Sequence, residues 1–168
     1  MQRDSNQPTQ TRKKPYPDTI QPGIYESENL PSAKNKNREL FRVKASRLLE
    51  LLPDELVIQE KTISVIRREI LMSYVETLPI RDIGRVVLTE AGPFASLILV
   101  GKNPEHQLQI KNLPRDKAEK AKEIIDGLLL EYEEAIAVPE WLSTDERREI
   151  FQQAGQQSQS QNRIQNRL

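Results

Sequence analysis

The sequence has no cysteine, one histidine and one tryptophan among its 168 residues. Without cysteine the chain forms no disulfide, holds no zinc–thiolate or iron–sulfur centre and offers no thiol nucleophile. The single histidine, His106, closely follows the turn at Asn103-Pro104, where a partly exposed position at the end of a strand is expected. A catalytic histidine would need a nucleophile and an orienting partner, and no motif supplies them.

Other chemical signatures are missing too. The six glycines are dispersed, and neither Gly84 nor Gly92 belongs to a G-x-G-x-x-G or Walker pattern. The acidic run at residues 131–134 lacks the loop that calcium binding requires. We therefore expect no enzymatic activity, no metal site and no cofactor.

Long hydrophobic runs are absent as well. The longest clearly apolar run, Phe94–Val100, is far too short to span a bilayer. The first thirty residues are polar and show no secretory pattern. We expect a cytoplasmic protein, with peripheral attachment to the inner face of the membrane as the alternative.

Neither sign of charge prevails, since 25 basic residues balance 25 acidic ones. The net charge is +4 over residues 1–53, −2 over residues 54–131 and −2 over residues 132–168. Nucleic-acid binding normally needs a dense basic face or exposed aromatic pairs for base stacking, so nucleic acid is not expected as a partner. The N-terminal excess weakly favours an anionic surface.

The residue patterns that are present predict a helix, then a series of strands, then a second helix. Residues 1–37 are rich in proline and polar residues and predict a disordered tail. Residues 38–53 carry apolar side chains at roughly helical spacing up to Pro53, which predicts a helix. Between residues 54 and 111, short apolar and alternating segments separated by turns predict strands. Pro114–Glu131 has the apolar stripe of an amphipathic helix.

One strand breaks the rule of alternation. Ile63 and Val65 share a face, and strict alternation would place Arg67 on that same apolar face. We expect either that this strand ends near Ile66 or that a bulge re-aims the side chains.

The C-terminal region predicts a linker and a short peripheral helix within residues 133–155. Ser143 and Glu146 have the spacing of a capping box, and Gly155 has the character of a helix stop. A helix at about Thr144–Ala154 is expected, followed by a disordered tail over residues 156–168.

Antiparallel strands, the segment Thr77-Leu78-Pro79-Ile80-Arg81-Asp82-Ile83, two hairpin turns and a closing amphipathic helix resemble a bacterial pleckstrin-homology-like (PH-like) domain over roughly residues 46–131. The resemblance implies an α+β fold: a PH-like antiparallel β-barrel or half-barrel at residues 54–132, closed by the C-terminal amphipathic helix. The predicted helix precedes it, and the short peripheral helix follows. Such domains bind lipid headgroups, peptides or protein surfaces, so the resemblance implies binding.

The same resemblance points to candidate site residues. Lipid-binding members carry spaced basic residues on the first two strands, and Lys61, Arg67 and Arg68 are the positions here that match. They form the candidate ligand or anion site, although a dense basic loop is missing. Phe94 and Trp141 are the candidate partner surface; the alternatives are a core position for Phe94 and a cap on the apolar rim for Trp141.

The sequence thus predicts a non-catalytic binding or scaffolding module. The first hypothesis is interaction with a protein or peptide at a sheet edge or beside the closing helix, where an extended partner adds a strand. The alternative is peripheral membrane association through anionic lipid headgroups, using the candidate basic residues and the basic N-terminal run. The oligomeric state is not determined by the sequence.

Overall fold

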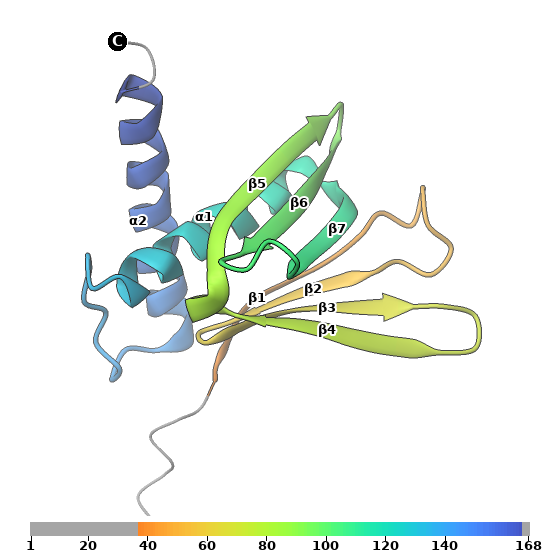
Figure 1. Cartoon of the computed structure of the whole chain (residues 1–168), viewed down its shortest axis with the longest axis horizontal. Coiled ribbons are helices and arrows are strands. Elements are labelled where there is room, and N and C mark those ends of the chain that lie inside the picture. Colours follow the sequence, from red (N-terminus) through yellow and green to blue (C-terminus); the bar gives the residue numbers. More distant parts are fainter. Residues whose placement is uncertain (1–36, 166–168) are drawn as a thin grey trace, which may run out of the picture. The chain divides into compact units, whose positions relative to one another are not determined.

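Seven strands and two α-helices make up residues 37–165, the part of the chain that the computed structural model describes (Figure 1). The strands are β1 (Glu39–Lys44), β2 (Glu55–Gln59), β3 (Thr62–Arg68), β4 (Ser73–Pro79), β5 (Ile83–Ala91), β6 (Phe94–Gly101) and β7 (Gln107–Pro114). The helices are the 3-10 turn η1 (Ile80–Asp82), α1 (Arg115–Tyr132) and α2 (Thr144–Gln165). Of the tails predicted over residues 1–37 and 156–168, residues 1–36 and 166–168 lie outside the described residues.

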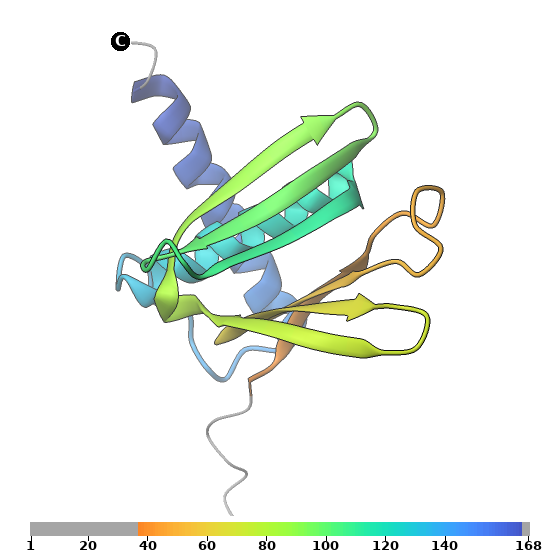
Figure 2. The same cartoon turned by 45° about the vertical axis from the view of Figure 1, so that its right-hand side comes forward.

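The strands form two antiparallel sheets, one in the order β1-β2-β3-β4 and the other in the order β5-β6-β7. The sheets diverge towards the free ends of their hairpins, so they form a half-barrel and do not close into a full barrel (Figures 1 and 2). This confirms the predicted α+β class and the PH-like arrangement of strands followed by a closing helix.

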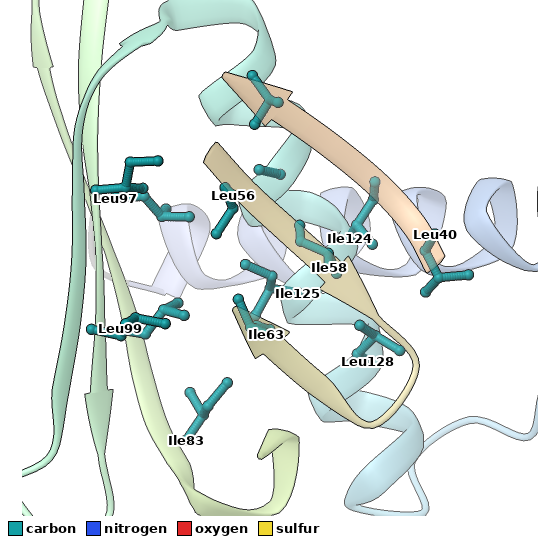
Figure 3. Packing of buried hydrophobic residues seen from close by; sticks show 14 of the residues in the cluster. Leu40, Leu56, Ile58, Ile63, Ile83, Leu97, Leu99, Ile124, Ile125 and Leu128 are labelled. Carbon is teal, nitrogen blue, oxygen red and sulfur yellow. The ribbon is translucent and has the colours of Figure 1, made fainter. Parts of the chain in front are cut away.

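The core lies between the inner faces of the two sheets and one face of α1 (Figure 3). Alternate residues of β2 and β6, such as Leu56 and Leu97, are buried there together with Ile125 of α1. Two small residues on α1, Ala118 and Ala121, are fully buried. Their short side chains allow the helix to approach the strands closely.

The predicted helix at residues 38–53 is wrong: Glu39–Lys44 is strand β1, paired with β2. Leu40 and Val43 are buried, while Arg42 and Lys44 face outward or lie partly exposed. Six residues are too few for the spacing of apolar side chains to distinguish a helix from a strand with one irregularity. Residues 39–44 form a strand because they pair with the edge of β2. A register shift between Glu39 and Phe41 accounts for the near-helical spacing of the buried side chains.

Strand β3 continues to Arg68 without a bulge, so neither expected break occurs. Arg67 does lie on the face of Ile63 and Val65, as strict alternation requires. Its guanidinium is accommodated there because Nη1 donates to Asp54 at 2.8 Å and Nε donates to Glu76 at 2.8 Å. Nη2 donates to the carbonyl oxygen of Gln109 at 2.7 Å and so links β3 to β7 of the other sheet.

The C-terminal helix is longer and better packed than predicted. The capping box is confirmed, since the amide of Glu146 donates to Oγ of Ser143 at 3.3 Å and the Ser143 amide donates to the Glu146 carboxylate at 2.9 Å. Gly155, however, does not end the helix, and α2 runs on to Gln165. The predictions of a short, peripheral helix and of a disordered segment at residues 156–165 are therefore wrong.

Close packing of α2 on α1 explains why Gly155 lies inside a helix. A methyl group on Gly155 would lie 2.0 Å from the carbonyl oxygen of Glu123, and one on Gly127 would lie 2.0 Å from that of Phe151. Each glycine therefore allows the backbone of the opposite helix to approach. Phe151 is completely buried at this crossing.

Arg147 fixes the first turn of α2. Its side chain is 4% exposed, and its guanidinium donates to Glu60 at 2.7 Å and to the carbonyl oxygens of Val138 and Pro139 at 2.8 and 2.9 Å. It also lies 3.2 Å from Glu131 of α1. One side chain thus joins α2 to the β2–β3 turn, to the end of α1 and to the linker between the helices.

Candidate functional site

Two neighbouring loops lie at one end of the four-stranded sheet (Figures 1 and 2). Their apolar side chains are exposed to solvent. We call this surface the apolar tip. It consists of Leu48, Leu49, Leu51 and Leu52 in the β1–β2 loop and Ile70, Leu71 and Met72 in the β3–β4 loop. Leu51 is 90% exposed and Leu71 is 93% exposed, values usual for charged side chains.

The polar groups of the β1–β2 loop point towards the domain and hold the loop in place. The Glu50 carboxylate accepts from Nδ2 of Asn112 at 2.8 Å, and the Ser46 amide donates to the Asn112 carbonyl oxygen at 2.7 Å. The amide of Ala45 donates to the carbonyl oxygen of Asp54 at 2.8 Å and closes the base of the loop. The loop therefore satisfies its polar groups internally and leaves its leucines outside, the reverse of an ordinary surface loop.

A hollow of about 700 Å³ lies between the two loops. Leu51 and Leu52 line one side and Ile70 to Met72 the other. The rest of the lining is charged and consists of Glu50, Asp54, Arg68 and Glu69. Pockets of this size are typical of ligand sites, and exposed apolar clusters of this kind mark interaction surfaces.

The predicted site residues do not form one cluster. Lys61 lies just before β3, whereas Arg67 and Arg68 lie at the other end of that strand. Six residues of extended chain separate Lys61 from Arg67 by roughly 20 Å. Phe94 begins β6 and is half-buried, and Trp141 lies in the linker between the helices.

Arg67 and Arg68 both have carboxylate partners. Arg68 lies 2.6 Å from Glu55, whose carboxylate also accepts from Arg42 at 2.9 Å. Burial raises the pKa of Glu55, but the hydrogen bond from Arg42 and the neighbouring positive charges outweigh it, so that the pKa is lowered. Partial burial lowers the pKa of Arg67, and Glu76 and Asp54 outweigh that effect and leave the pKa raised. Both arginines are thus held by acidic groups of the domain itself.

The interpretation of Trp141 as a cap on the apolar rim is wrong. Its side chain is 82% exposed, and Phe151 of α2 is the aromatic residue buried in that region. The preceding linker is held instead by Arg147 and by Arg38, whose guanidinium donates to the carbonyl oxygen of Leu142 at 2.8 Å. Trp141 and Phe94 remain predictions as a partner surface.

Sequence reasoning missed the apolar tip because it assigned those leucines to a helix. A signal was available in the run Leu48-Leu49-Glu50-Leu51-Leu52-Pro53, which is apolar and bounded by proline, and in Ile70-Leu71-Met72 between two strand-like segments. Two such loops next to each other in a hairpin sheet predict one joint apolar surface.

Among the described residues no group of three or more histidine, aspartate or glutamate side chains has the geometry to hold a metal ion. None of the helices in residues 37–165 combines the length and apolar character needed to cross a membrane.

Residues 37–165 thus form an α+β module of two antiparallel sheets and two helices, with an apolar loop surface at one end. A search of solved structures finds similarity to the pleckstrin homology (PH) domain of USP37, with 16% sequence identity and a TM-score of 0.40. The match covers 54% of this chain and 97% of that domain. No protein-family model matches the chain, and no characterised protein matches it in sequence.

Proposed function

We propose that this chain is a non-catalytic module that binds another protein, taking an extended apolar segment as an added strand at the edge of β4. The observation that supports this most is the position of an unguarded strand edge directly beside the apolar tip.

Strand β4 has few of the features that normally protect a sheet edge, since Glu76 and the terminal Pro79 are its only charged residue and its only proline. It pairs with β3 over seven consecutive residues, Ser73–Pro79, without a register shift. Strands β1, β5 and β7 also lie at sheet edges, and the pairing of each is interrupted by a shift in register. β4 carries no lysine, and its Tyr74 and Val75 are 43% and 59% exposed. A second chain thus finds its free backbone groups next to exposed apolar side chains.

The apolar tip supplies anchoring energy but not all that is needed. Full burial of an aliphatic side chain contributes about 1.5–3 kcal/mol. Three anchors such as Leu51, Leu71 and Met72 would contribute roughly 5–9 kcal/mol, against an association cost of about 4–15 kcal/mol. Hydrogen bonds along β4 would supply the remainder, which favours a partner that engages both surfaces.

The predicted headgroup residues do not gather as free cations at the tip, which supports a protein partner more than an anionic bilayer. Arg67 and Arg68 are held by Asp54, Glu76 and Glu55, and Lys61 lies at the far end of β3. A headgroup site needs cations near the apolar loops, and the exposed cations there are Lys44 at the end of β1 and Arg47 in the β1–β2 loop. Binding to an anionic membrane is therefore one of the outcomes that the experiments on peptides and vesicles distinguish.

A peptide-display library provides the test. We expect selected peptides to be extended and apolar at alternate positions, and to shift the amide NMR signals of β4 and of both tip loops. Val75→Pro, which removes one backbone donor, and Leu71→Ser should each weaken binding at least tenfold. Glu105→Ser, on an exposed turn elsewhere, serves as the control and should change nothing.

Two results would overturn the proposal. One is selection of peptides whose binding leaves β4 and the tip unperturbed. The other is salt-sensitive sedimentation with phosphatidylserine vesicles that depends on Lys61, Arg67 and Arg68 while no peptide binds, which would establish the membrane alternative.

A further inference from the structure

A second pocket lies at the opposite end of the four-stranded sheet from the apolar tip. It has a volume of about 520 Å³, within the range of small-molecule sites. The β2–β3 turn, the segment around η1 and the last turn of α1 form its walls. The Ile80 amide donates to the carbonyl oxygen of Lys61 at 2.9 Å and fixes the turn against η1.

The inner part of the pocket is apolar. Ile80 and Leu128 are 4% and 1% exposed, and Pro79 lies beside them. Both buried residues belong to the core cluster, so the pocket reaches the hydrophobic interior of the domain. An apolar body entering here would displace water from a surface that offers it few hydrogen bonds.

The acidic groups in the pocket wall are already paired. The Glu60 carboxylate lies 2.9 Å from Arg38 and 2.7 Å from Arg147, and Arg147 also lies 3.2 Å from Glu131. These two arginines balance the two carboxylates within a network that is largely buried. The wall therefore presents no unpaired negative charge to a ligand.

Two further cations at the pocket have no such partner. Within the described residues, no carboxylate lies within 4.0 Å of the Lys61 ammonium group. Arg81 has one loose contact, 3.8 Å to Asp82, and its side chain is 70% exposed. Lys61 and Arg81 thus give the pocket a surplus of positive charge next to an apolar interior.

We propose that this pocket binds a small amphipathic acid, with its apolar body against Ile80 and Leu128 and its carboxylate between Lys61 and Arg81. Charge-assisted hydrogen bonds from two cations orient such a ligand, and the apolar interior supplies most of the contact area. The site is distinct from the apolar tip, because the two surfaces lie at opposite ends of β3.

Titration followed by NMR tests this site with the whole chain. Decanoate and 1-naphthylacetate, one linear and one flat, should shift the amide signals of Thr62, Ile80 and Tyr132. The double variant Lys61→Met/Arg81→Met retains the apolar stems of both side chains and should weaken carboxylate binding at least tenfold. Decanol, which lacks the charge, should bind the wild-type protein and the double variant equally. The relative affinities of the two acids report the shape of the pocket.

Lys111→Met is the matched control, since Lys111 is exposed on β7 outside the pocket. It should bind both acids as the wild-type protein does. Leu71→Ser should likewise leave acid binding unchanged, which separates this site from the proposed function. Absence of acid-induced shifts at millimolar probe, equal affinity for the double variant, or shifts confined to the apolar tip would each overturn the proposal.

Discussion

Replacing Gly127 with alanine tests the closeness of the two helices directly. In an exposed helix the change from glycine to alanine stabilises by about 1 kcal/mol, because alanine loses less backbone freedom on folding. Here the added methyl group would lie 2.0 Å from the Phe151 carbonyl oxygen and 2.6 Å from its carbonyl carbon. The steric effect therefore opposes the effect of helix propensity. A decrease in the free energy of unfolding would show that the steric effect is larger, and an increase would show that helix propensity is larger.

The magnitude follows from the distances. Cβ contacts below 3.0 Å are essentially never seen, so the helices must separate by about 1 Å or shift along each other. Both contacting atoms are backbone, so no flexible side chain can move aside. Overpacking of this kind costs typically 1–3 kcal/mol and occasionally more, and loosening the contacts of the fully buried Phe151 adds to it. Taking the upper part of this range, because backbone atoms cannot move aside, and subtracting a propensity gain of about 1 kcal/mol, we expect destabilisation by about 1–2 kcal/mol.

Urea denaturation followed by circular dichroism measures this difference as a shift in the transition midpoint. Gly155→Ala should behave alike, because its methyl group would lie 2.0 Å from the Glu123 carbonyl oxygen. Gln153→Ala, at an exposed position on α2, is the control and should stay within about 0.5 kcal/mol of the wild-type protein. If Gly127→Ala stabilised the protein by about 1 kcal/mol, the close helix contact would be refuted.

Three further predictions follow from side chains described above. Arg147→Met should lower the free energy of unfolding by about 3–5 kcal/mol, since it leaves carboxylates of a largely buried network unpaired; a loss below 1 kcal/mol in the same urea assay would contradict this. The pKa of Glu55 lies below its ordinary value of 4.5 in the folded state, so its contribution to stability is present above that pH and is lost as the pH falls through the lowered pKa. The free energy of unfolding of Glu55→Gln should therefore fall less steeply with decreasing pH than that of the wild-type protein. An unchanged slope would argue against the Arg42–Glu55–Arg68 arrangement. Trp141 is 82% exposed, so its fluorescence maximum and its quenching by acrylamide should change little on unfolding; a large red shift would mean that the indole is buried.

Part of the candidate site was within reach of the sequence and part was not. Strict alternation assigns Arg67 to the face of Ile63 and Val65, yet a break was expected there because an arginine has no evident partner on an apolar face. Only the fold brings Asp54, Glu76 and the Gln109 carbonyl oxygen to its guanidinium. Lys61 and Arg81 lie 20 positions apart in the chain and line the same pocket because the β2–β3 turn is hydrogen-bonded to η1. A ligand pocket joining three segments has no local pattern from which it can be predicted.

The sequence by itself determined the segments whose periodicity is long or whose ends are marked chemically. Strands β2 to β7, helix α1 and the capping box at Ser143 follow from alternation, an apolar stripe and a hydrogen-bonding side chain, all of which are local properties. Tertiary structure decided β1, which pairing with β2 turned into a strand, and Gly155, which helix packing kept inside α2. In both cases local preferences of about 1 kcal/mol were outweighed by hydrogen bonds and burial that depend on residues distant in the chain.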